Sequence, residues 1–372
     1  AVPVMVAVYT PDGAKIVSAS QYEYPIVWDV TSGRVLNYLK QNTQSYVYDY
    51  WNYASFSPDG SRIATSVDKM AKIWNMETGK LMFTLPAHKD YIRTVEWSPD
   101  GLKVVTASND STARIYDAVK GVLLFELKGH KDKVNSAMWN AQSSKIATAS
   151  ADKTAKIWEA STGSLLYTLP WHAKDVLSVT WSPDGSKVAT ASADNKAFLW
   201  DAKTGDLIAN FSEHTKAVMK VVWNPNGSRV ATISQDSTAM IWKAEASFPL
   251  LTLSGHRGAI YDAAWSPDGT MLATSSSDKT ARIWDVAQGK LLYTLVGHTG
   301  SVNTINWSPD GSKVVTGSDD YTIKIWNLKS LSLVQEAVSP VFSIVVPGGS
   351  AHDIDLKQCP VGDVKDTLVQ AY

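Results

Sequence analysis

The sequence has little that would support disulfide bonds, membrane spans or a strong electrostatic field. Cys359 is the single cysteine among 372 residues, so neither an internal disulfide nor a thiolate metal cluster can form. No apolar run reaches the roughly 20 residues that a membrane-spanning helix needs, and the apolar N-terminus lacks the basic start of a signal peptide. The formal charge of −1 gives no global attraction to nucleic acid or anionic lipid. We therefore expect an intracellular, cytoplasmic protein whose partners are neither nucleic acids nor membranes.

Phenylalanine is scarce as well, whereas the other aromatic residues are abundant and periodic. The chain has 7 Phe against 15 Trp and 15 Tyr. Six histidines follow one another at steps of 42 residues, and two aromatic series keep the same step. The histidines are His88, His130, His172, His214, His256 and His298. A fixed period of this length indicates a repeat architecture in which each unit forms one supersecondary element.

Each period has the pattern of four short β-strands. In the seventh unit we expect strands at 259–265, 271–276, 281–285 and 291–295, with the turn Ser266-Pro267-Asp268-Gly269 after the first. Ser, Pro and Gly stand where a type I turn favours them. Eight such units can be counted, and none of them contains a helical period. The sequence therefore predicts an all-β array over residues 1–338, followed by a tail at 339–372.

The units resemble the WD repeat, in which a Gly-His pair is followed by Trp-Asp at the end of the third strand. Gly255-His256 with Trp284-Asp285 shows the pattern in full, and the resemblance covers about residues 3–338. It implies an eight-bladed WD40-type β-propeller, with seven blades as the alternative. Unit 8 is expected to end with a strand at Ser332–Val338. The tail contains one further possible strand at 341–346, which could pair with blade 8 or blade 1 or begin a ninth unit.

Five units carry the same four polar or aromatic residue types at matching positions. The resemblance implies a chain of hydrogen bonds from the indole N–H to Ser, from Ser to His, and from His to Asp. The sets are His130, Ser150, Asp152 and Trp158; His172, Ser192, Asp194 and Trp200; His214, Ser234, Asp236 and Trp242; His256, Ser276, Asp278 and Trp284; and His298, Ser318, Asp320 and Trp326. Unit 3 has Tyr116 at the Trp position, and units 1 and 2 lack the His.

Ser, His and Asp in one motif also resemble a catalytic triad, but a triad occurs once and requires an exposed nucleophile. Five copies joined to a buried Trp indicate a structural role, so we expect no catalytic residue. Each periodic histidine has its own Asp and Ser, which argues against metal binding. His352, Asp353 and Asp355 in the tail are interpreted as solvated residues. We expect no metal, cofactor or small-molecule substrate.

The resemblance also implies contact positions around one mouth of the channel, three and five residues after each His. Leu177, Met219 and Tyr261 would form an apolar arc there, while Tyr50, Tyr91 and Arg93 would form an aromatic and cationic one. We interpret these six residues as partner-binding candidates. The alternative is that Leu177 and Met219 merely line the channel. The enlarged loop at 41–51 could bind a partner or fill the space left by missing histidines.

Three functions follow from these observations. The first is a non-catalytic scaffold that binds a peptide or domain of another protein at the channel mouth. The second is an architectural subunit of a large assembly, docked through blade edges and the tail. The third is an enzyme with its site in the channel, which the scattered charges at the mouth do not support.

Overall fold

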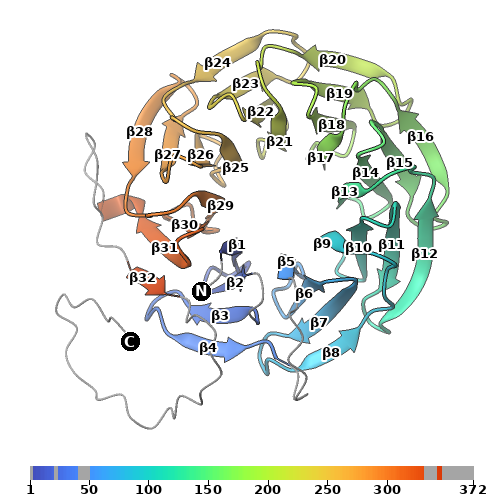
Figure 1. The fold of residues 1–372 in the computed structure, drawn as a ribbon, viewed down its shortest axis with the longest axis horizontal. Helices are drawn as coiled ribbons and strands as arrows, with labels where there is room; N and C mark the ends of the chain where they lie inside the picture. Colours follow the sequence, from blue (N-terminus) through green and yellow to red (C-terminus); the bar gives the residue numbers. More distant parts are fainter. Residues whose placement is uncertain (1–2, 21–23, 41–50, 331–341, 346–372) are drawn as a thin grey trace.

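The computed structural model describes residues 3–20, 24–40, 51–330 and 342–345. These residues form eight four-stranded antiparallel sheets arranged as the blades of a ring around a central channel (Figure 1). Each sheet uses four consecutive strands in chain order, from β1-β2-β3-β4 to β29-β30-β31-β32. The eight-bladed all-β prediction is confirmed.

The first strand of every blade lies closest to the channel and the fourth forms the rim (Figure 1). The inner strands are β1 (Val4–Tyr9), β5 (Trp51–Phe56), β9 (Ile92–Trp97), β13 (Val134–Trp139), β17 (Val176–Trp181), β21 (Val218–Trp223), β25 (Ile260–Trp265) and β29 (Val302–Trp307). The second strands are β2 (Lys15–Ser20), β6 (Arg62–Val67), β10 (Lys103–Ser108), β14 (Lys145–Ser150), β18 (Lys187–Ser192), β22 (Arg229–Ser234), β26 (Met271–Ser276) and β30 (Lys313–Ser318).

The third strands are β3 (Ile26–Asp29), β7 (Met70–Asn75), β11 (Thr112–Asp117), β15 (Ala155–Glu159), β19 (Ala197–Asp201), β23 (Ala239–Lys243), β27 (Ala281–Asp285) and β31 (Thr322–Asn327). The outer strands are β4 (Val35–Tyr38), β8 (Leu81–Thr84), β12 (Val122–Lys128), β16 (Leu165–Leu169), β20 (Leu207–Phe211), β24 (Pro249–Leu253), β28 (Lys290–Leu295) and β32 (Phe342–Val345). A short 3-10 helix, η1 (Leu328–Ser330), follows β31.

Burial follows the radial position of a strand. The second strands are buried along almost their whole length, because each blade is covered on both faces by its neighbours. In β14 the residues after Lys145 are Ile, Ala, Thr, Ala and Ser, whose small or β-branched side chains suit a strand packed on both faces. The outer strands are more exposed, and β8 alternates between partly buried and exposed residues. The core therefore consists of layers between blades.

The turn after the inner strand forms as the sequence predicts. In blade 2 the Gly60 N–H donates to the Ser57 carbonyl oxygen over 2.8 Å, and the Ser57 hydroxyl donates to the Asp59 carboxylate over 2.5 Å. The carboxylate also accepts the Ser61 N–H. These bonds hold the pKa of Asp59 at about 2, below its usual range. Gly60 has a φ of 69°, a left-handed conformation that glycine adopts without strain.

Blade 8 differs from the prediction in its outer strand. The segment expected to supply it, Ser332–Val338, lies outside the described residues, and the strand that pairs with β31 is β32. Ile323 is opposite Ile344 in this pairing. The outer strand of blade 8 is thus taken from the segment that the sequence assigned to the tail, and of the alternatives expected for the strand at 341–346, pairing with blade 8 is confirmed. The prediction failed because several apolar stretches after β31 have strand character, and only their placement against β31 distinguishes them.

The ring closes by packing one complete blade against another. Tyr9, Ile16 and Trp28 of blade 1 form one core cluster with Val315 and Ile323 of blade 8. Both blades are built from consecutive strands, so neither combines strands from the two ends of the chain. The sequence of unit 1 already contains four strand patterns in order, which agrees with a closure that needs no strand exchange.

Candidate functional site

A chain of hydrogen bonds runs through the interior of the regular blades. In blade 4 the Trp158 indole N–H donates to Thr148 Oγ1 over 2.9 Å, and that hydroxyl lies 2.7 Å from His130 Nε2. His130 Nδ1 lies 2.8 Å from the Asp152 carboxylate. Because only Nδ1 faces a pure acceptor, Nδ1 carries the imidazole proton and the Thr148 hydroxyl donates to Nε2. Every group in the chain is therefore satisfied.

The hydroxyl in this chain belongs to a threonine, so the predicted serine is wrong. Trp158 is directly opposite Ile146 across the β14–β15 pair. Thr148 lies two residues farther along the strand, about 7 Å away, whereas Ser150 lies twice as far. Ser150 instead donates to the Asp132 carbonyl oxygen and accepts the Asp152 N–H. It orders the loop that carries the aspartate.

The correction applies to all five sets. The linking hydroxyls are those of Thr148, Thr190, Thr232, Thr274 and Thr316, in place of Ser150, Ser192, Ser234, Ser276 and Ser318. Blade 3 keeps His88, Thr106 and Asp110, but its Tyr116 hydroxyl donates to the Pro86 carbonyl instead. In blades 1 and 2, which lack the histidine, Trp28 donates to Ser18 and Trp74 to Thr65.

These sets have the properties of packing groups. The His130 and His256 side chains are fully buried. Burial lowers their pKa below the usual histidine value and outweighs the opposite effect of the Asp hydrogen bonds. The imidazoles of His130 and His256 are therefore neutral and enclosed, without access for a substrate. Within the described ranges, no cluster of three or more His, Cys, Asp or Glu side chains could hold a metal ion. His352, Asp353 and Asp355 lie outside those ranges.

The predicted contact positions coincide with a structural irregularity that the sequence did not reveal. The residue five positions after each His is the extra residue of a β-bulge in the inner strand. Leu177 lies between Val176 and Ser178, which pair with successive residues of β18. Arg93, Met219 and Tyr261 occupy the same place in β9, β21 and β25. A bulge leaves its residue out of the ladder and redirects its side chain.

The six candidates differ in how much they present to solvent. Tyr91 and Tyr261 are 43 and 38 % exposed, and Arg93 is exposed while its Nε donates to Asn109 Oδ1 over 2.7 Å. Leu177 and Met219 are half-buried, and Met219 packs against the core between blades 6 and 7. Tyr50 lies outside the described residues. Leu177, Met219 and Tyr261 belong to the inner strands of three consecutive blades, so their backbones follow one another around the channel.

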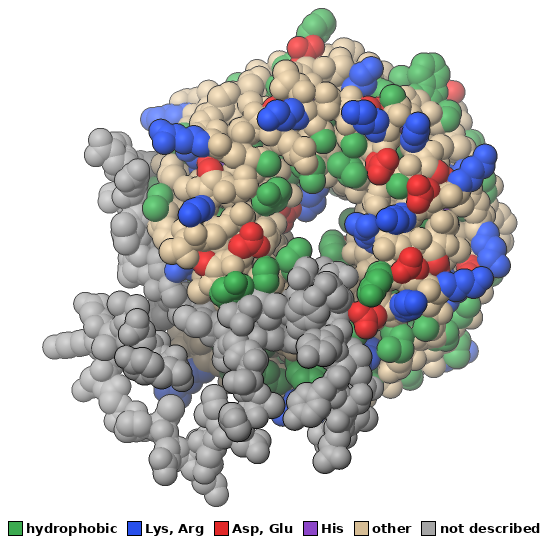
Figure 2. Space-filling model, in the orientation of Figure 1, with side chains coloured by type: hydrophobic (Ala, Val, Ile, Leu, Met, Phe, Trp, Pro, Cys, Tyr) green, Lys and Arg blue, Asp and Glu red, His purple; other side chains and the backbone are tan. Residues whose placement is uncertain are grey.

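The channel wall contains charged residues that sequence reasoning missed. Lys220 of blade 6 forms an ion pair of 2.6 Å with Asp262 of blade 7, whose second oxygen accepts the Ile305 N–H of blade 8. Glu96 of blade 3 accepts the Ser55 hydroxyl of blade 2 over 2.9 Å. One signal could have identified them, since each lies one or three residues before the aromatic residue that ends an inner strand. Figure 2 shows the open channel with charged side chains of both signs near its rim.

The sequence model of the family described as "WD domain, G-beta repeat" matches seven segments of the chain, which together cover well over half of it. They are residues 37–75, 79–117, 121–159, 163–201, 205–243, 247–285 and 289–327. The chain belongs to the WD40-repeat family. Proteins of this family are in general non-catalytic platforms for other proteins.

The WD40 segments are offset from the blades of this propeller. The first matched segment, 37–75, begins in β4 and ends with β7, so a sequence repeat joins the outer strand of one blade to three strands of the next. Strands β1 to β3 precede the first match and β32 follows the last. Seven matched repeats are therefore compatible with eight blades.

A solved structure has a fold similar to that of this chain. The chain is similar to the computationally designed Ika8 protein, with a TM-score of 0.78, 24 % identity, and coverage of 88 % of this chain and 96 % of Ika8. At this identity the likeness concerns the fold alone. In the part of the chain that the structure describes, no helix has the length and apolarity for a membrane crossing.

Proposed function

We propose that this WD40 propeller is a non-catalytic scaffold that binds a peptide or domain of another protein over the channel mouth formed by its Gly-His loops. The observation that carries this proposal is the β-bulge repeated in the inner strands, which puts a redirected side chain at the predicted contact position of each blade. The bulge residues of blades 5 to 7 are Leu177, Met219 and Tyr261. Adjacent apolar side chains on a polar rim are typical of a binding hot spot.

Charge and compartment support the same proposal. The formal charge of −1 favours neither nucleic acid nor anionic lipid as a partner. The single cysteine suits a reducing compartment, and we propose the cytoplasm as the location. In the channel, Lys220 and Asp262 neutralise each other, which argues against a catalytic pair there.

The second candidate is an architectural subunit that docks through its rim. One observation favours it, because apolar side chains are exposed along several outer strands. They include Leu36, Met82, Leu123, Leu165 and Leu250. Exposed apolar residues on a sheet edge can be covered by another subunit.

A capture experiment distinguishes the two. The double variant Met219→Ser/Tyr261→Ser should lose partners that the unmodified chain recovers by cross-linking from the source cells. The matched control, Leu102→Ser/Val119→Ser, changes two exposed apolar residues in turns at the other end of the blades and should keep them. Thermal unfolding of both variants checks that the fold persists.

The opposite pattern supports the architectural role. If the double variant recovers every partner, and a chain ended after Val346 loses them, the channel-mouth proposal is wrong. That shortened chain retains β32, so a loss of partners would not arise from an unpaired β31.

A further inference from the structure

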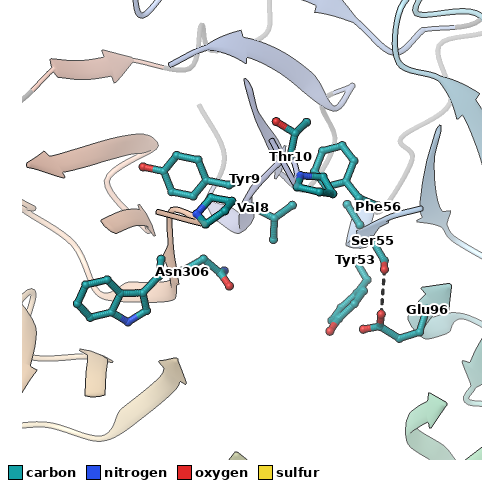
Figure 3. Close-up of a pocket in the computed structure, with 12 residues that line it drawn as sticks. Val8, Tyr9, Thr10, Tyr53, Ser55, Phe56, Glu96 and Asn306 are labelled. Carbon is teal, nitrogen blue, oxygen red and sulfur yellow. Dashed lines mark hydrogen bonds between the residues drawn. The ribbon is translucent and has the colours of Figure 1, made fainter. Parts of the chain in front are cut away.

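A cavity of about 320 Å³ lies beside the channel where blades 8, 1, 2 and 3 meet. Its lining includes Val8, Phe56, Glu96, Tyr53 and Asn306 (Figure 3). It also includes turn residues that follow β1 and β29, among them Pro11 and Pro309. The cavity therefore opens at the end of the inner strands that carries the Ser-Pro-Asp-Gly turns, away from the Gly-His loops.

The cavity exists because two blades lack the tryptophan that ends the other inner strands. In five blades this indole donates to a carbonyl oxygen of the preceding inner strand, at 2.9 to 3.3 Å. Blades 1 and 2 have Tyr9 and Phe56 at this place. Phe56 has no donor, and the buried Tyr9 hydroxyl has no hydrogen-bond partner among the described residues. The smaller rings leave space that an indole would fill.

Glu96 supplies the carboxylate in the lining of this cavity. Glu96 accepts a hydrogen bond from the Ser55 hydroxyl over 2.9 Å, and the neighbouring Tyr53 hydroxyl also lowers the pKa of Glu96. An ionised carboxylate can accept about four, so acceptor capacity remains. Among the described residues no Lys or Arg nitrogen forms an ion pair with Glu96. Figure 3 shows Glu96, Ser55 and Tyr53 gathered on one side of the cavity, with Asn306 across from them.

The position of Glu96 is unusual within the ring. The residue immediately before the terminal aromatic of the inner strand is uncharged in the seven other blades. These residues are Val8, Ser55, Met138, Thr180, Val222, Ala264 and Asn306. Burial raises the pKa of Glu96, and its hydrogen-bonding neighbours and the Lys220 charge only partly oppose this effect. A half-buried carboxylate without an ion-pair partner is destabilised, and a cationic guest would relieve that cost.

We propose that this cavity binds a guanidinium or ammonium group on an apolar stem, with the cation at Glu96 and the stem against Tyr53 and Phe56. Aromatic faces attract such cations, and the apolar stem replaces water against Val8 and Phe56. An anion would be repelled by Glu96, and a purely apolar guest would leave the carboxylate without solvent. The volume lies near the lower limit for ligand pockets, which suits a group the size of an arginine side chain. The guest could be a free organic cation or the side chain of a partner protein.

The test uses the full chain and two small probes of nearly equal shape. N-butylguanidinium carries the charge, and N-butylurea is its neutral counterpart. Ligand-observed NMR titration should give saturable binding of N-butylguanidinium and at least about tenfold weaker binding of N-butylurea, as expected for a hydrogen bond to a charged group. Glu96→Gln should reduce the affinity for N-butylguanidinium by a similar factor. The control Glu77→Gln, in an exposed turn, should not change it.

A second variant keeps the test valid if Glu96→Gln perturbs the fold. Phe56→Trp restores the aromatic residue found in most blades, fills the cavity, and retains the carboxylate. It should abolish binding while raising the thermal midpoint. Equal affinity for the two probes, or unchanged binding in either variant, would overturn the proposal.

The source of the guest is tested with acetyl-arginine-methylamide. Tighter binding of this probe than of N-butylguanidinium supports a partner side chain, and equal binding supports a free cation. The site lies at the opposite end of the channel from Met219 and Tyr261. Failure here therefore leaves the proposed scaffold function untouched, and the reverse also holds.

Discussion

The Asn303 side-chain amide donates a hydrogen bond of 3.2 Å to the carbonyl oxygen of Val4, which lies 299 residues earlier in the chain. Asn306 makes a similar bond of 3.0 Å to Ala7. Both bonds cross from blade 8 to blade 1, the junction where no covalent connection joins consecutive blades. At the other junctions, a loop leads from the outer strand of one blade to the inner strand of the next. Among the described residues, side-chain hydrogen bonds and apolar packing hold this junction closed.

We predict that Asn303→Ala weakens the contact between blades 8 and 1 more than Asn135→Ala weakens the contact between blades 4 and 5. Asn135 is the matched control, because it occupies the same bulge position and donates to the Val176 carbonyl over 2.9 Å between blades 4 and 5. Each change should cost about 0.5–1.5 kcal/mol of the free energy of unfolding. Only Asn303→Ala should accelerate amide hydrogen exchange in β1 and β29, because those strands can separate without stretching a connecting loop. Equal local exchange in the two variants would contradict this.

The corrected hydrogen-bond chain predicts opposite effects for two neighbouring residues of β26. Thr274 is shared by the Trp284 indole and the His256 imidazole, so Thr274→Val should lower the free energy of unfolding by about 1–3 kcal/mol. Ser275 is equally buried, but its hydroxyl has no partner among the described residues. Ser275→Ala should be neutral or stabilising. Urea unfolding of both variants checks the pair, and a harmless Thr274→Val would refute the shared-hydroxyl interpretation.

The buried histidines predict a loss of stability in mild acid. Burial lowers the pKa of His88, His130, His256 and His298 below the usual 6.5. Below pH 6.5 the unfolded chain therefore binds more protons than the folded one. The contribution of these neutral histidines to the free energy of unfolding is complete above pH 6.5, and it is lost as the pH falls toward their folded-state pKa values.

Each of these histidines should contribute up to about 1.4 kcal/mol per pH unit within that window. Burial alone would raise the pKa of Asp278, but the hydrogen bonds that it accepts from His256 and Thr280 hold it well below its usual range, so the carboxylates act only at lower pH. Urea unfolding between pH 8 and pH 5 measures the slope. His256→Gln should have a shallower slope than the unmodified chain, and identical slopes would show that the imidazoles do not titrate as described.

The sequence was sufficient for those features that a single unit fixes locally. The turn at Ser57, Asp59 and Gly60 depends on residues within five positions of one another, so its residue types predict its geometry. Residue types do not decide whether Thr148 or Ser150 bonds the Trp158 indole, because both lie on the same face of β14. Only the register against β15 decides which hydroxyl the Trp158 indole can reach. The bulges at Leu177 and Met219 also depend on register and leave no mark in residue types.

The sequence alone determined the number of units, their four-stranded pattern and the buried His, Asp and Trp positions, because each of these features recurs with a 42-residue period. Tertiary structure decided which strand completes blade 8, because β32 must find the free edge of β31 across an intervening segment. It also decided that Glu96 lies beside a cavity, because the space left at Tyr9 and Phe56 appears only when blades 8, 1, 2 and 3 come together. Local propensity shapes a blade, but closure of the ring brings residues of distant blades into one site.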